Sequence, residues 1–179
     1  MVLSLIIKLH IFMLEQLMSL VKEHSGEHIV NNAAVPNEHN EAAVSSVATS
    51  IFAVLQTQVA NGNVGSLLQM FQGNNQQNAD GTVVNAQNTQ GNPIMNSMIS
   101  SVVGNFATKF GMNEQTATGI ANSLLPTIMA SFVSKTNDEK DSSFSIQGIL
   151  AAVGGADGKL DIGGLLGNLF GGNKDNQPK

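Results

Sequence analysis

Residues 92–110, NPIMNSMISSVVGNFATKF, decide the fold class of this chain. Their apolar side chains recur at intervals of three and four residues, which is the spacing of a helix face. Two adjacent lines on that helix hold most of them: Ile94, Met98 and Val102 on one, and Ile99, Val103, Phe106 and Phe110 on the other. So wide an apolar stripe indicates a helix that other elements cover on more than one side. Asn92 and Pro93 suit its cap and its first turn.

The same periodicity predicts helices at residues 13–24, from about 38 to 59 and from 114 to about 134. Gly111 suits a helix end and Asn113 suits the cap of the helix that follows.

Pro126 interrupts the last of these predicted helices, so a kink or a break is expected near Leu124. Shorter apolar pieces lie at 64–71, 145–155 and 161–172. No stretch alternates apolar and polar residues as a half-buried strand would. The predicted fold is therefore all-α, a multi-helix orthogonal array.

The chain also contains an apparent internal repeat. Asn37 and Glu38 precede one long predicted helix as Asn113 and Glu114 precede the other, and NVGSLLQMFQG (63–73) is similar to DIGGLLGNLFGG (161–172). Two quasi-repeated helical halves are expected, joined by a polar linker. The predicted boundaries are an N-terminal extension or misassigned start at 1–12, halves at 13–71 and 93–172, a flexible linker at 72–92 and a disordered tail at 173–179.

Composition excludes several classes of function. The 179 residues include no cysteine, so disulfides, thiolate metal sites and cysteine nucleophiles are absent. All eight basic residues are lysines, thirteen residues are acidic, and the net charge is -5. Nucleic-acid binding needs a basic face and is favoured by arginine and stacking aromatics, whereas this chain has no arginine, tyrosine or tryptophan. We expect no nucleic-acid partner.

The N-terminal sequence MVLSLIIKLHIF is apolar but does not fit a signal peptide. Its one positive charge, Lys8, follows the apolar run instead of preceding it, and no small-residue cleavage site comes after it. Lys8, His10 and Glu15 also interrupt the run of about 20 apolar residues that a membrane-spanning helix needs. An amphipathic helix that opens at Met13 is the preferred interpretation, and a membrane-surface helix is the alternative.

Four segments resemble the YidB-like bacterial family of unknown function. They are MLEQLMSLVKEHSGEHIVNN, VPNEHNEAAV, SKTNDEKDSSFSIQGIL and GGLLGNLFGG, and the resemblance covers roughly residues 13 to 172. It implies an all-helical, multi-helix fold in a bacterial, cytoplasmic protein, and it supports Met13 as the natural start. It implies no reaction, because the family has no established catalytic residues to carry onto this chain.

One motif has the spacing of a zinc site. His24, Glu27 and His28 form H-x-x-E-H, in which two histidines one helical turn apart can chelate zinc while the carboxylate acts on bound water. Gly26 between them weakens a helix by about 1 kcal/mol relative to alanine. Third ligands are suggested by proximity alone: Glu38, His39 and Glu41. A solvated helix end is the preferred interpretation, with no metal and no cofactor.

The glycine-rich C-terminal region contains part of a calcium-loop pattern: Asp157, Gly158, Leu160 and Asp161. The first and twelfth positions of that loop require acidic ligands, but Val153 and Gly164 occupy them. The glycines do not follow a strand and lack the G-K-[ST] of a phosphate loop. A turn between two apolar segments is expected.

These observations favour a non-enzymatic helical protein that acts through self-association or through contact with a protein partner. Two alternatives remain open: a zinc-dependent hydrolase that uses His24, Glu27 and His28, and a membrane-surface protein anchored by its N-terminal apolar helix.

Overall fold

A computed structural model describes residues 2–71, 92–138 and 145–154, with side chains from residue 7 onward. Its long helices are α1 (Val2–His24), α2 (Asn40–Ala60), α4 (Pro93–Phe110) and α5 (Glu114–Thr136). Its shorter elements are a π turn (Gly26–Val30), a 3₁₀ turn (Asn37–His39), α3 (Val64–Phe71) and α6 (Ile146–Gly154). No strand occurs in these described ranges, so the prediction of an all-α fold is confirmed.

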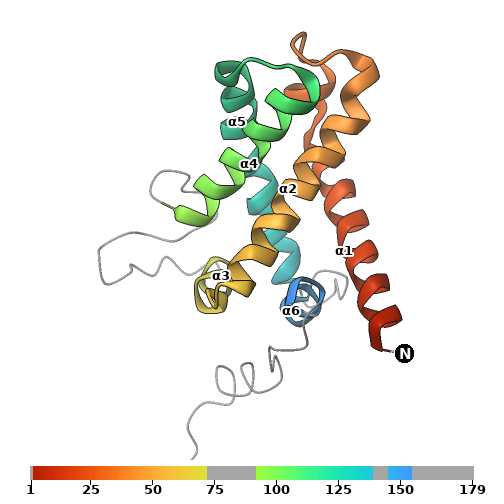
Figure 1. Cartoon of the computed structure of the whole chain (residues 1–179), viewed down its shortest axis with the longest axis vertical. Helices are drawn as coiled ribbons and strands as arrows, with labels where there is room; N and C mark the ends of the chain where they lie inside the picture. Colours follow the sequence, from red (N-terminus) through yellow and green to blue (C-terminus); the bar gives the residue numbers. More distant parts are fainter. Residues whose placement is uncertain (1, 72–91, 139–144, 155–179) are drawn as a thin grey trace, which may run out of the picture.

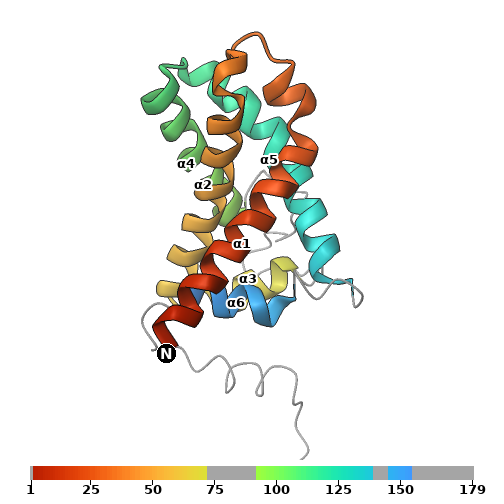
Figure 2. The ribbon, with the colours of Figure 1, turned by 90° about the vertical axis from the view of Figure 1, so that its right-hand side faces the viewer.

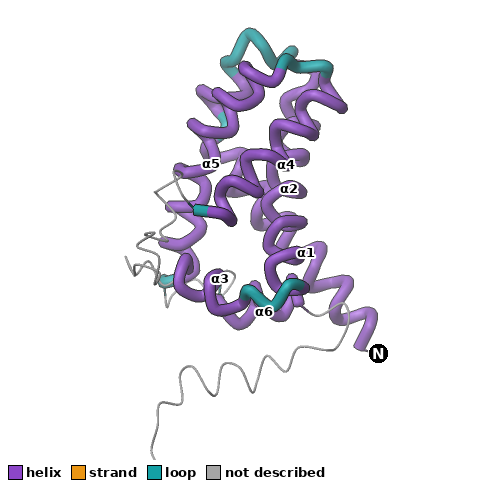
Figure 3. The backbone as a smooth tube through the Cα atoms, turned by 60° about the vertical axis from the view of Figure 1, so that its left-hand side comes forward, coloured by secondary structure: helices purple, strands orange, loops and turns teal. Residues whose placement is uncertain are grey.

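The four long helices run roughly along the long axis of the molecule, and α3 and α6 lie across one end of it (Figure 1). The tube view in Figure 3 shows the same arrangement from another side. Helix α2 packs against α1, α4 and α6, and α4 also packs against α5. The prediction that residues 92–110 are covered on more than one side is therefore correct, since α2 and α5 both pack on α4.

The helix caps predicted at Asn92 and Asn113 are present. The Asn92 side chain accepts hydrogen bonds from the backbone N–H groups of Ile94 and Met95, at 2.9 and 3.3 Å. Asn113 caps α5 in the same way by accepting from Thr116 N at 2.8 Å. Gly111 ends α4 with a φ of 63°, a left-handed conformation that glycine adopts without steric cost.

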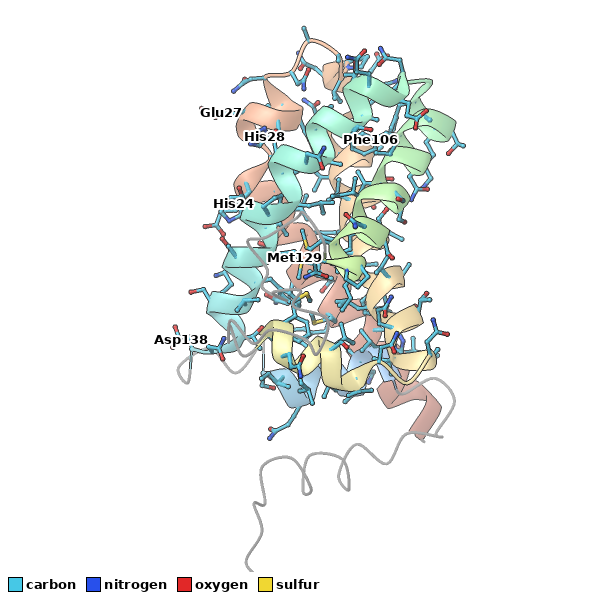
Figure 4. The ribbon with its side chains drawn as sticks, turned by 90° about the vertical axis from the view of Figure 1, so that its left-hand side faces the viewer. His24, Glu27, His28, Phe106, Met129 and Asp138 are labelled. Atoms are coloured by element: carbon cyan, nitrogen blue, oxygen red, sulfur yellow. The ribbon has the colours of Figure 1, made fainter. Side chains whose placement is uncertain are left out.

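One apolar core joins elements from both ends of the chain. Its largest fully buried aromatic side chains are Phe71, Phe106 and Phe132, and the rings of Phe71 on α3 and Phe132 on α5 meet edge to face at 5.3 Å. Several methionines are also buried in the core: Met13, Met70, Met95, Met98 and Met129. Figure 4 shows sulfur atoms in the middle of the helices near Met129. These methionines are core residues.

Two local features differ from the sequence-based expectation. The first helix begins at Val2, not at Met13, so residues 2–12 continue it without interruption. A kink or a break was expected near Leu124, and helix α5 has no break there, because it runs from Glu114 to Thr136 through Pro126. Leu124 and Leu125 are fully buried, and their packing keeps this segment helical. The helix lacks one backbone hydrogen bond there, because Pro126 has no N–H group.

The described residues do not test the predicted internal repeat. Its C-terminal element, 161–172, lies outside the described residues, as do the tail at 173–179 and all of the predicted linker except Asn92. Among the described helices, α2 (Asn37–Ala60 with its 3₁₀ turn) and α5 are long and apolar enough to cross a membrane by length and composition. Two such helices are weak evidence, because buried core helices pass the same test, and 61% of the α2 window and 44% of the α5 window are buried inside the protein.

Candidate functional site

The H-x-x-E-H residues lie at the junction between α1 and the π turn. His24 is the last residue of α1, while Glu27 and His28 belong to the π turn. The two histidines therefore do not occupy the i and i+4 positions of one α-helix, which the chelate geometry requires. Across the described ranges, no group of three or more histidine or acidic side chains is placed to hold a metal ion. The structure does not bring Glu38, His39 or Glu41 to this motif as a third ligand.

His24 instead pairs with a serine on another helix. Its Nε2 lies 2.8 Å from the Oγ of Ser131 on α5, and both side chains are half-buried. Figure 4 shows His24 at the edge of the molecule beside α5, with Glu27 and His28 further along that edge.

A histidine–serine pair is also the core of a nucleophilic site, which needs an orienting acid and an oxyanion hole. Within the described residues no carboxylate hydrogen-bonds to His24. Ser131 lies inside α5, where the backbone N–H groups are already bonded within the helix. The arrangement ties α1 to α5 by a hydrogen bond and has no acyl-transfer geometry.

Two other histidines also lie between helices. His10 on α1 hydrogen-bonds to Gln56 on α2 at 3.1 Å, and its ring meets Phe52 edge to face at 5.4 Å. The ring of His39 contacts Phe110 on α4 at 5.7 Å. These histidines hold helices together.

A shallow hollow of about 410 Å³ lies between α4 and α5. Its lining is mixed apolar and hydroxyl: Ile99, Ser100, Val103, Gly104, Ala107, Glu114 and Thr118. Its one carboxylate, Glu114, stands in the first turn of α5, where the helix dipole favours a negative charge. None of the residues singled out for metal chemistry reaches this hollow.

Among the described residues, three of the four exposed large apolar side chains lie on α1, and the fourth is Val30. Ile7, Ile11 and Phe12 are 51%, 53% and 41% exposed. Ile7 and Ile11 share one face of the helix with half-buried Leu14 and Met18. We call Ile7, Ile11, Leu14 and Met18 the α1 stripe. Figure 2 shows α1 crossing the front of the molecule with no other helix over it.

The helix predicted from the sequence covers only the inner part of this surface. That helix begins at Met13, so it contains Leu14 and Met18 but not Ile7 or Ile11. Leu17 and Val21 are buried, whereas the exposed Ile7 and Ile11 precede the predicted start. The signal was present in the spacing 7, 11, 14 and 18, which continues one helix face across Met13.

Comparisons with protein-family models, with curated proteins and with solved structures found no match to this chain. The resemblance to the YidB-like family therefore stays a prediction of the sequence. The calcium-loop residues, Asp157, Gly158, Leu160 and Asp161, lie outside the described residues.

Proposed function

We propose that this chain is a non-enzymatic helical protein that acts by association, with itself or with a protein partner, through the α1 stripe. The observation that carries the proposal is the exposure of about half of Ile7 and of Ile11 on one face of a core helix. Single exposed apolar residues are common, but exposed apolar residues in register with half-buried ones form a continuous surface. A cytoplasmic location and membership of the YidB-like family are parts of the same proposal.

Site-specific photo-crosslinking in living cells tests this function. A photo-reactive phenylalanine replaces Ile11 in one variant and Glu23 in a matched control. Glu23 is exposed on the same helix but points about 120° away from Ile11, at about 100° per residue. We expect protein adducts at position 11 and none above background at position 23.

Equal crosslinking at the two positions, or none at either, would refute the proposal. Adducts with lipid alone would instead favour the membrane-surface alternative, in which Phe12 also enters the bilayer interface. Co-sedimentation of the purified chain with anionic vesicles, compared with its Phe12→Ser variant, measures that outcome separately.

A further inference from the structure

The α1 stripe has the spacing of a helix-pairing seam. Its members are separated by four, three and four residues, the interval of the apolar positions in two-helix coiled coils. The buried residues of α1, such as Leu17 and Val21, point into the core on an adjacent face. The α1 stripe is therefore a second apolar surface of α1, next to the face that is buried in the core.

Two opposite charges flank this stripe on one side. Lys8 and Glu15 are both exposed and are separated by seven residues, so they take the same position in successive heptads. Two helical turns place them about 10 Å apart along α1, too far for them to pair with each other. Neither forms an ion pair with any of the described residues.

We infer that the occupant of the α1 stripe is a second copy of this chain, bound antiparallel about a two-fold axis near Ile11. The inference rests on the proposed function and names its partner. In this arrangement Lys8 of one copy faces Glu15 of the other, and the same contact repeats across the axis. In a parallel pairing, Lys8 and Glu15 of the two copies would lie on opposite sides of the seam, so no Lys8–Glu15 contact would form. The charge pattern therefore complements itself in one orientation only.

The length of the seam limits the affinity of the dimer. Ile7 to Met18 spans about 16 Å of helix, which is short for a specific interface. The dimer is accordingly a reversible one that dissociates on the order of micromolar concentration.

Charge reversal in the full-length chain tests the inference by sedimentation equilibrium. Lys8→Glu and Glu15→Lys each replace two attractions by two repulsions, and we expect each to weaken dimerisation about tenfold. An equimolar mixture of the two variants carries complementary charges at both contacts, so we expect it to regain dimers of wild-type affinity. The matched control is Lys22→Glu, an exposed lysine on the same helix beyond the end of the stripe, which should change the affinity less than about twofold.

Circular dichroism of each variant is the control that its helices are intact. Failure of the mixture to regain dimers, or an equal effect of Lys22→Glu, would overturn the antiparallel seam. A wild-type chain that stays monomeric at all concentrations would also overturn it. If position 11 then still crosslinks to a different protein in cells, the proposed function holds and only the identity of the partner is wrong.

Discussion

The contact between Phe71 and Phe132 gives a sharp quantitative prediction about how α3 is held on the fold. Both rings are fully buried, and they meet at an interplanar angle of 78°, close to the favoured edge-to-face geometry. The Nδ2 of Asn137 also donates to the backbone oxygen of Phe71 at 2.7 Å, so the two helices are joined at a second point.

Replacing Phe132 by leucine removes the ring contact and leaves a space in a well-packed core. We expect Phe132→Leu to lower the free energy of unfolding by about 2 kcal/mol, or the melting temperature by about 4–8 °C for a chain of this length. Phe71→Leu should cost a similar amount. Because each substitution removes the same aromatic pair, the double variant should cost about 1 kcal/mol less than the sum of the single variants.

Urea titration followed by far-UV circular dichroism measures these free energies, since the chain has no tryptophan or tyrosine for fluorescence. The control cycle combines Phe71→Leu with Phe106→Leu. Phe106 lies on α4, toward the opposite end of the molecule from α3 (Figure 4), so those two changes should add. Additive effects of Phe71→Leu and Phe132→Leu would refute the ring contact.

Three further predictions concern a helix end, a helix contact and the zinc motif. Gly111→Ala should lower the free energy of unfolding by about 1–2 kcal/mol in the same urea titration, because φ is 63° there, and a neutral effect would contradict that conformation. Ser131→Ala should cost about 1 kcal/mol through loss of the His24 hydrogen bond, whereas exposed Ser134→Ala should stay within about 0.5 kcal/mol, and equal costs would argue against the contact. Excess zinc should leave the melting temperature unchanged, and one zinc per chain, abolished by His28→Ala, would revive the hydrolase hypothesis.

The sequence predicted the features that depend on neighbouring residues. Helix caps interact only with residues a few positions away in the sequence. Local reasoning therefore located the caps at Asn92 and Asn113 and the helix end at Gly111 correctly. Pro126 shows the limit of such reasoning. Its local effect is to weaken a helix, but burial of the adjacent Leu124 and Leu125 overrides that effect.

The contacts of the candidate sites depend on tertiary structure. His24 and Ser131 are 107 residues apart, and nothing in their local sequence indicates the pairing. The exposure of Ile7 and Ile11 could not be read from periodicity either, because an apolar helix face can be covered by the protein itself or left free for a partner. Only the packing of α2, α5 and α6 on the other side of α1 shows which part of its apolar surface remains free.

Native mass spectrometry of the full chain, compared with its Ile11→Lys variant, is the most direct test of self-association through the α1 stripe. Burying the exposed half of Ile11 in each of two copies contributes about 2 kcal/mol, so Ile11→Lys should weaken association about thirtyfold while the helices stay intact. We predict the mass of two 18.7 kDa chains for the wild type at micromolar concentration and the mass of one chain for the variant. The same assembly mass for both proteins would contradict self-association through the α1 stripe.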